Sequence, residues 1–249
     1  MYTTLSGQIG VSKQIDVIAN NLANMNTTGY RSERPLFERV LSDAKSISEP
    51  SFRKDLSAPD TFQTEEYSKI RESYSDLSQG PIDQTGNPLD VAIDGKGFFI
   101  VQTPNGERYT RAGNFRLDST NRLVTSSGRP VLGSGGEILL PPGDIKISQD
   151  GSILVNGQAV NKLRIVDASA RQLVRDSEQL FSLAPGAVAS EVVSPTLHSG
   201  AIEGSNVNAV RELSDMILAS KLFEQLKTAQ DAESKVSEES IAHVGLTAG

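Results

Sequence analysis

The sequence predicts an α+β protein in which an all-β domain, rich in Gly and Asn turns, lies between an N-terminal and a C-terminal helix. Apolar residues recur every three or four positions near both ends of the 249-residue chain, as in amphipathic helices. Between these ends, turn sequences such as TPNGE, SSGRP and VNGQ recur about every eight to twelve residues. They separate short apolar or alternating runs such as FFIVQT and SILV, which is typical of antiparallel strands.

The N-terminal helix is expected from about Thr3 to Asn24, a stretch without proline. Its apolar stripe is narrow, closer to a coiled-coil seam than to the broad face of a globular helix. The stripe consists of Leu5, Val11, Ile15, Ile18 and Leu22. We expect the NTTGY sequence to end the helix, because Gly29 can adopt the left-handed conformation that closes one.

The C-terminal helix is expected from about Val207 to Ala242, with Ser205 or Asn206 as its N-cap. A helix of this length with a narrow stripe suggests a coiled coil or a helical assembly. The stripe consists of Val207, Val210, Leu213, Ile217, Ser220, Phe223, Leu226, Ala229, Glu233 and Val236.

These features divide the chain into four segments. They are an N-terminal assembly helix (1–35), an extended connector (36–79), the β domain (80–200) and a C-terminal assembly helix (201–249) that packs with 1–35. Two paired helices with narrow stripes still leave apolar surface uncovered, so other copies or related chains are expected to cover it.

Composition excludes several classes of protein. The formal net charge of −7 disfavours nucleic-acid binding, which needs a basic surface. Cysteine is absent, so disulfides and thiolate metal sites are excluded. The N-terminus lacks the basic and apolar regions of a secretory signal peptide, and no apolar run approaches the length of a membrane span.

Residues for catalysis are scarce, so we expect no enzymatic activity, no cofactor and no metal. The only histidines are His198, expected to cap or line a loop, and His243 near the C-terminus. GKGFF lacks the spacing of a phosphate-binding loop, and Gly95 and Gly97 are better explained by a tight turn before a strand. Asp90 and Asp94 are likewise expected in turns, not at a metal.

Three sequence blocks resemble the rod and hook proteins, the axial proteins of the bacterial flagellum. The first, ANNLANMNTTGYRSER, matches the family pattern at Asn20, Asn21, Leu22, Ala23, Asn24, Thr28, Gly29 and Tyr30. The second comprises GNPLDVAIDGKGFFIVQTPNGERYTRAGNF and RLVTSSGRPVLG, and the third is GAIEGSNVNAVREL. The chain is too short for the extra outer domains of hook proteins. It looks most like the proximal rod protein with a single β domain, and the distal rod protein is the alternative.

The resemblance implies a structural subunit of the basal-body rod, the drive shaft that crosses the periplasm and transmits motor torque to the hook. It implies helical self-assembly through the terminal helices, with copies of itself and other rod proteins as partners. It also implies export by the flagellar type III apparatus without a cleaved signal peptide, and neither a nucleic acid nor a small-molecule substrate as ligand.

The residues expected at the assembly interface lie in the two helices and the turns next to them. We expect Ile15, Ile18 and Leu22 to pack against Val210, Leu213 and Ile217, or against the counterparts of these in neighbouring subunits. The full set is Leu5, Val11, Ile15, Ile18, Asn20, Asn21, Leu22, Asn24, Gly29, Tyr30, Gly204, Ser205, Asn206, Val207, Val210, Leu213, Ile217, Phe223 and Leu226.

Two functions of other classes remain open at this point. One is a free-standing β domain that binds glycans or surfaces and carries helical oligomerisation ends. The other is a hydrolase acting on cell-wall glycan. The low aromatic content, 5% of residues, argues against both, because sugar-binding grooves are usually lined with aromatic side chains.

Overall fold

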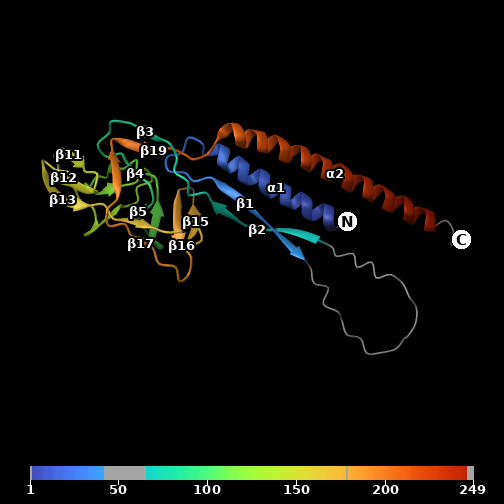
Figure 1. The fold of residues 1–249 in the computed structure, drawn as a ribbon. Coiled ribbons are helices and arrows are strands. Elements are labelled where there is room, and N and C mark those ends of the chain that lie inside the picture. Colours follow the sequence, from blue (N-terminus) through green and yellow to red (C-terminus); the bar gives the residue numbers. More distant parts are fainter. Residues whose placement is uncertain (1, 42–65, 178, 246–249) are drawn as a thin grey trace, which may run out of the picture. The chain divides into compact units, whose positions relative to one another are not determined.

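The computed structural model describes residues 2–41, 66–177 and 179–245 (Figure 1). Most of the connector predicted at 36–79 therefore lies outside the described residues. The side chain of Leu5 and the part of the predicted C-terminal stripe at Glu233 and Val236 also lie outside the side chains that are described.

The chain forms two compact units, and both contain segments from distant parts of the sequence. One unit contains the described parts of 1–18, 35–73 and 214–249, and the second contains those of 19–34 and 74–213. The second unit, called the β unit below, therefore holds the β domain together with the end of the first helix, the turn after it and the start of the last helix.

Helices lie at the two ends of the chain, as the sequence predicts. Helix α1 runs from Tyr2 to Ala23 and helix α2 from Ala209 to Gly245. Figure 1 shows the two side by side and antiparallel. The ideal Cβ position of Gly7 lies 3.5 Å from a methyl group of Leu226, so Gly7 of α1 and Leu226 of α2 lie next to each other.

Two strands at the ends of the predicted connector pair with each other. They are β1 (Glu33–Leu41) and β2 (Glu66–Ser75), which form a two-stranded sheet. The polar, aperiodic sequence of this region does not predict them, because it lacks the alternation of apolar residues that marks a half-buried strand.

The β unit contains a six-stranded antiparallel sheet in the order β15-β16-β6-β5-β14-β17. Its strands are β5 (Phe98–Thr103), β6 (Gly106–Thr110), β14 (Ile165–Asp167), β15 (Leu173–Ser177), β16 (Leu180–Leu183) and β17 (Ser190–Glu191). A three-stranded meander consists of β11 (Ile145–Ile147), β12 (Ser152–Val155) and β13 (Gln158–Lys162). Short pairs complete the unit: β3 (Ile82–Gln84) with β19 (Ala201–Glu203), β4 (Val91–Asp94) with β18 (Thr196–Ser199), β7 (Arg116–Leu117) with β8 (Leu123–Val124), and β9 (Leu132–Gly133) with β10 (Gly136–Glu137).

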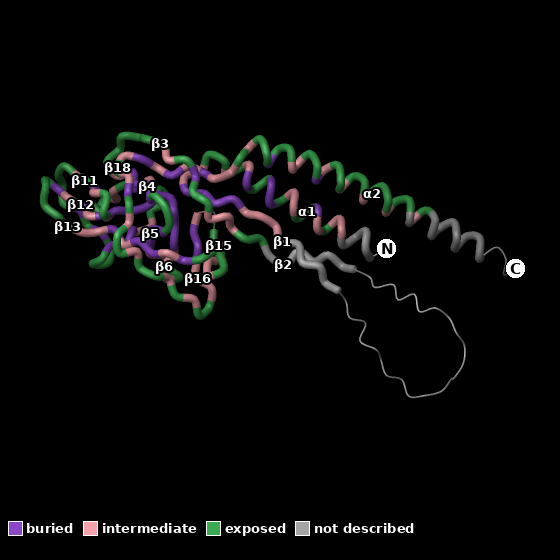
Figure 2. The backbone as a smooth tube through the Cα atoms, viewed as in Figure 1, coloured by how far each residue is buried: buried purple, intermediate pink, exposed green. Residues whose placement is uncertain are grey.

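Strand β5 is buried on both faces, which explains its continuous apolar sequence FFIV. Successive side chains of a strand point to opposite faces. Phe99 accordingly packs into the larger core cluster and stacks edge-to-face on Phe115, with 5.0 Å between the ring centroids. Phe98 packs into a second cluster and makes an edge-to-face contact with Phe181. Figure 2 shows this burial concentrated in the strands of the β unit.

The predicted turns lie where the sequence places them. The VNGQ turn joins β12 to β13 with positive φ at Asn156 and Gly157, the conformation expected of a tight hairpin turn. Gly95 and Gly97 also have positive φ and form the turn that leads into β5, as predicted.

Candidate functional site: the helix pair and the junction in the β unit

The two helices pack through one apolar seam. Val11, Ile18 and Ala219 are buried in it, and Ile15, Met216, Phe223 and Leu226 pack against them. Val11, Ile15 and Ile18 come from the stripe predicted on the first helix, and Phe223 and Leu226 from the stripe predicted on the second. The buried Val17 lies outside the predicted stripe.

The intrachain pairing predicted for Val210, Leu213 and Ile217 is wrong. These side chains are 78%, 51% and 51% exposed, and Met216 and Ala219 face α1 instead. At about 100° per residue, the exposed stripe is about 130° around the helix axis from the α1-facing seam. Both stripes repeat every three or four residues, so periodicity alone could not show which one faces α1.

Helix α2 has apolar side chains on a third side as well. Leu218 is 64% exposed and Leu222 is 45% exposed. These two lie about 100° from the α1-facing seam, on the side opposite the stripe of Val210, Leu213 and Ile217. Figure 2 shows that most of the described residues of α2 are exposed, with few buried positions. A helix that is apolar on several sides is adapted to more than one packing partner.

Asparagine side chains hold the chain at the end of α1. The Asn21 amide donates to the backbone oxygen of Glu33 at 2.9 Å and accepts from the backbone N–H of Glu33 at 2.8 Å. It also donates to the carboxylate of Glu212 in the first turn of α2 at 3.3 Å. Asn21 therefore replaces a strand partner for the start of β1 and joins it to α2. The Asn24 amide donates to the backbone oxygen of Asn20 at 2.9 Å, which caps the end of α1.

Tyr30 is buried beside these asparagines. Its hydroxyl lies 2.9 Å from the amide oxygen of Asn20 and 3.2 Å from that of Asn21. Burial raises the pKa of Tyr30 to about 12, and the positive charge of Arg175 opposes this effect. The guanidinium of Arg175 lies 4.8 Å from the Tyr30 ring centroid, donates to the backbone oxygen of Arg31 and pairs with Glu33. Arg175 thus fixes the segment after α1 onto β15.

Gly29 has a left-handed conformation, as predicted, but it does not close the helix. Helix α1 ends at Ala23, and Gly29 has a φ of +68° in the turn that follows. Its N–H donates to the backbone oxygen of Glu203 at 2.7 Å. A Cβ at this position would lie 2.3 Å from the backbone nitrogen of Ala112. Glycine is required because three separate backbone segments meet here.

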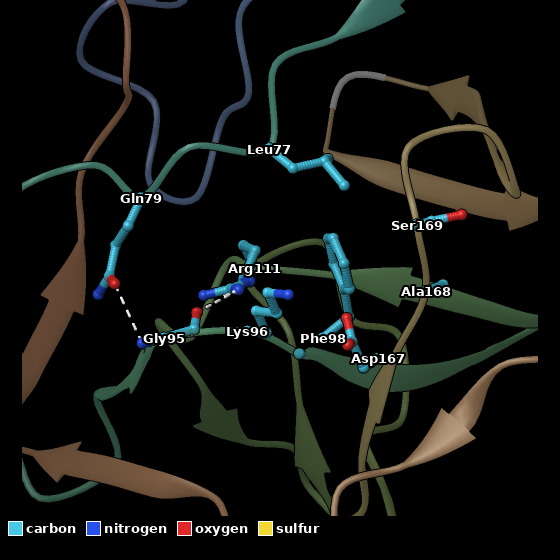
Figure 3. A pocket seen from close by; sticks show the side chains of 10 residues that line it. Leu77, Gln79, Gly95, Lys96, Phe98, Arg111, Asp167, Ala168 and Ser169 are labelled. Carbon is cyan, nitrogen blue, oxygen red and sulfur yellow. Dashed lines mark hydrogen bonds between the residues drawn. The ribbon is translucent and has the colours of Figure 1, made fainter.

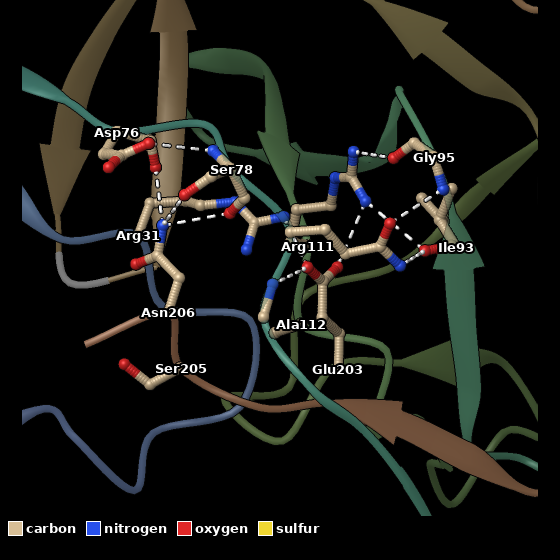
Figure 4. Close-up of polar contacts among 12 residues, drawn as sticks. Arg31, Asp76, Ser78, Ile93, Gly95, Arg111, Ala112, Glu203, Ser205 and Asn206 are labelled. Atoms are coloured by element: carbon tan, nitrogen blue, oxygen red, sulfur yellow. Dashed lines mark hydrogen bonds and ion pairs between the residues drawn. The ribbon is translucent and has the colours of Figure 1, made fainter. Parts of the chain in front are cut away.

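A buried ion cluster lies at the centre of this junction (Figure 4). One carboxylate oxygen of Glu203 accepts from Arg31 at 2.6 Å and from the backbone N–H of Gly80 at 2.9 Å. The other accepts from Arg111 at 3.1 Å. The side chains of Arg31 and Glu203 are fully buried, and that of Arg111 is 4% exposed. Three segments far apart in the sequence are therefore joined by one carboxylate.

The cluster carries two cations and one anion. Burial lowers the pKa of Arg111 to about 10, an effect that Glu203 opposes and the charge of Arg31 increases. Glu203 is therefore the group on which this cluster depends most, because it is the carboxylate that both arginines contact.

The chain re-enters α2 through the segment from Gly204 to Asn208. Asn206 accepts from the backbone N–H of Ser32 at 2.7 Å and donates to the backbone oxygens of Asp76 and Ser78 at 2.9 and 3.0 Å. The predicted N-cap, Ser205 or Asn206, is wrong. The N-cap is Asn208, whose side-chain oxygen accepts from the N–H of Arg211 at 3.1 Å. Asn208 is also a favoured cap residue, and only the start of the helix at Ala209 decides between the three.

The remaining predicted interface residues lie near these two regions. Leu22 and Val207 are half-buried, and Gly204 packs against Pro81. Sequence reasoning missed Arg31, Arg111, Arg175, Glu203 and Glu212. Arg31 and Glu203 fall inside the quoted blocks TGYRSER and EGSNV, but no local pattern indicates that they pair.

The residues considered for chemistry have structural roles. His198 lies in strand β18 and not in a loop, and its ring nitrogen is 3.2 Å from the carboxylate of Asp94. Asp90 closes a turn from Asn87 and accepts from the side chains of Thr85 and Asn87, as predicted. The turn predicted at Asp94 is wrong, because Asp94 is the last residue of strand β4 and pairs with Thr196. Among the described residues there is no cluster of three His, Asp or Glu side chains that could hold a metal ion. The described part of neither helix is long and apolar enough to span a membrane.

Fold and junction define a class of protein. Its two terminal helices pair, and buried polar contacts join its β domain to the segments that end α1 and begin α2. Three family models match the chain in order. They are described as flagella basal body rod protein (residues 1–31), flagellar hook protein FlgE/F/G D1 domain (92–155) and flagellar basal body rod FlgEFG protein C-terminal (198–231).

Full-length relatives agree with the family models. The flagellar basal-body rod protein FlgF of Caulobacter vibrioides is 31% identical over 98% of this chain and 97% of its own length. FlgF of Escherichia coli is 33% identical over 94% of this chain and 93% of its own, and FlgG of Bacillus subtilis is 30% identical over 90% of each. The chain belongs to the flagellar basal-body rod protein family and is a structural subunit of the rod.

Proposed function

We propose that this rod subunit assembles with other copies and with other rod proteins through its terminal helices, in a helical tube with coiled-coil-like packing. The exposed apolar side chains of α2 carry this proposal. One side of α2 packs on α1, whereas Val210, Leu213 and Ile217 are exposed on a second side and Leu218 and Leu222 on a third. Neighbouring helices on both sides would bury them, as in a close-packed wall of helices.

Such a contact is heterologous, because one surface of a subunit meets a different surface of the next. Heterologous contacts that do not close into a ring propagate as a helical filament. A drive shaft that transmits torque from the motor to the hook needs many such contacts at once. In this scheme the junction around Glu203 joins the segment after α1 and the segment before α2 to the β domain, all within the β unit.

We further propose a position in the proximal rod. The single β domain, and the sequences SQGPIDQTGNPLDVAIDGKGFF and LHSGAIEGSNV, support it. The near-complete alignment with the FlgF proteins of C. vibrioides and E. coli supports a subunit of the FlgF kind. The family resemblance also supports export by the flagellar type III apparatus, a position crossing the periplasm and the absence of catalysis.

A matched pair of substitutions tests assembly through α2. Val210 in α2 and Val188 in a loop of the β unit are almost equally exposed, 78% and 77%. In cells that lack the natural chain, Val210→Asp is expected to abolish swimming and Val188→Asp to preserve it. Circular dichroism of both purified variants should show unchanged folds, because both side chains face solvent. Normal swimming with Val210→Asp would refute the proposed role of this stripe.

The proposed position of this chain in the proximal rod is tested by quantitative mass spectrometry of purified hook–basal-body complexes. A few copies of this chain per complex would support the proximal position. Tens of copies would indicate the distal rod, and absence of the chain would overturn the proposed assembly altogether.

A further inference from the structure

A pocket of about 460 Å³ opens on the β unit beside the turn that precedes β5 (Figure 3). Phe98, Leu77 and Ala168 give it an apolar lining. Lys96 and Arg111 add two positive charges, against the single carboxylate of Asp167. Pockets of this size accommodate several groups of a ligand and combine an apolar lining with a few polar contacts.

Arg111 links the pocket to the buried ion cluster. It is 3% exposed, and one of its terminal nitrogens donates to the backbone oxygen of Gly95 at 2.6 Å, in the turn that lines the pocket. Its Nε has no hydrogen-bond partner among the described residues. The carboxylate it contacts, that of Glu203, is shared with Arg31, which lies closer to it.

Three cations, Arg31, Arg111 and Lys96, lie at or beside the pocket with two carboxylates, Glu203 and Asp167, so one positive charge is left uncompensated. A buried guanidinium that shares one carboxylate with a second guanidinium would be stabilised by a further carboxylate. Arginine suits this role, because its planar guanidinium can bind two carboxylates from different directions. The pocket provides the approach, and Phe98, whose ring lies 5.2 Å from the Arg111 guanidinium, provides an apolar surface beside it.

The charge of the chain indicates where such a carboxylate would come from. The formal net charge is −7, so a second copy presents a predominantly acidic surface to this positively charged pocket. In a helical assembly the β unit of one copy would also lie near neighbouring copies, and such a contact would place a side chain in the pocket at high effective concentration.

We propose that the pocket receives an acidic side chain, Glu or Asp, and an adjoining apolar side chain from a second copy of this chain in the assembled rod. The carboxylate faces Arg111 and Lys96, and the apolar group packs on Phe98. This contact is additional to the helix packing proposed above and rests on the proposed assembly.

Photo-cross-linking in basal bodies tests the contact. Ser169 lines the pocket and is exposed, so a benzophenone amino acid can replace it without disturbing the core. Irradiation of isolated basal bodies should give a cross-link to an acidic segment of another copy, located by mass spectrometry of the digested product. Absence of an intermolecular cross-link, or a cross-link only to a different protein, would overturn the proposal.

Charge reversal at the rim gives a second measurement with a matched control. Lys96→Glu changes the pocket without touching Arg111, and Lys146→Glu makes the same change at an exposed site on β11. Lys96→Glu is expected to reduce the cross-link yield about tenfold or more, because it replaces attraction of the incoming carboxylate by repulsion, and Lys146→Glu to leave the yield unchanged. Equal yields for both variants would count against the role of charge at this pocket.

Failure of this inference can be told from failure of the proposed assembly. If the chain is present in basal bodies and swimming depends on Val210, but no cross-link forms at Ser169, only the pocket contact is refuted. If the chain is absent from basal bodies, both proposals are overturned.

Discussion

Replacement of Glu203 by glutamine should destabilise the β unit more than any single change at the same cluster that removes a cation. Glutamine keeps the size of the side chain and removes its charge. The buried carboxylate of Glu203 accepts from Arg31, Arg111 and the backbone N–H of Gly80. After the change, two guanidinium groups remain buried without the anion that they share, and the new amide NH₂ faces donors.

The expected loss in free energy of unfolding follows from the buried charge that the substitution leaves uncompensated. Removal of one member of a buried ion pair typically costs about 3–5 kcal/mol, because it leaves an uncompensated buried charge. The whole free energy of unfolding of a domain is only about 5–15 kcal/mol. Glu203→Gln should therefore remove roughly a fifth or more of it and lower the melting temperature by roughly 6–20 °C.

The comparison with Arg31→Met makes the test specific for charge. That variant loses the 2.6 Å hydrogen bond but leaves Glu203 with Arg111 and with the N–H of Gly80, which is a balanced pair. Its cost should be smaller, about 1–3 kcal/mol. Urea denaturation followed by tyrosine fluorescence measures both variants, since the chain has five tyrosines and no tryptophan.

An exposed ion pair provides the control. Glu137 lies 3.3 Å from Arg122, and both side chains are about 40% exposed, so Glu137→Gln should leave the urea midpoint unchanged. If Glu203→Gln is no more destabilising than Arg31→Met, the reasoning about the shared carboxylate is wrong.

Two further predictions concern the turn after α1. Gly29→Ala should destabilise the β unit by several kcal/mol, because the new Cβ would lie 2.3 Å from the backbone nitrogen of Ala112. Gly86→Ala is the control: it is also at positive φ but in open space, and should cost only about 1–2 kcal/mol. Similar urea midpoints for the two variants would contradict the close approach at Gly29. Burial raises the pKa of Tyr30 to about 12, so its proton is held more tightly in the folded state, and stability should fall as pH rises from about 10 to about 12. Tyr30→Phe should lack this fall and lack the last phenolate transition in a 295 nm titration, and persistence of that transition would exclude Tyr30 as its source.

Local features of the fold followed from the sequence. The limits of α1 and α2, the turn before β5 and the hairpin at Asn156 and Gly157 were predicted within a few residues. These features depend on interactions between residues close in the chain, such as 3.6-residue periodicity and the backbone freedom of glycine. The three sequence blocks that indicate the rod family belong to the same kind of information, because a motif can be recognised without knowledge of its contacts.

The partners of those local elements depended on the tertiary structure. The sequence shows that α2 has apolar stripes, but a period of 3.6 identifies a face and not what covers it. It therefore cannot show that Met216 and Ala219, and not Val210, Leu213 and Ile217, pack on α1 of the same chain. Arg31 and Glu203 are 172 residues apart and have no local signal of pairing. Their contact depends on tertiary packing, in which the backbone at Gly29 approaches that of Ala112 closely and both charged side chains are fully buried.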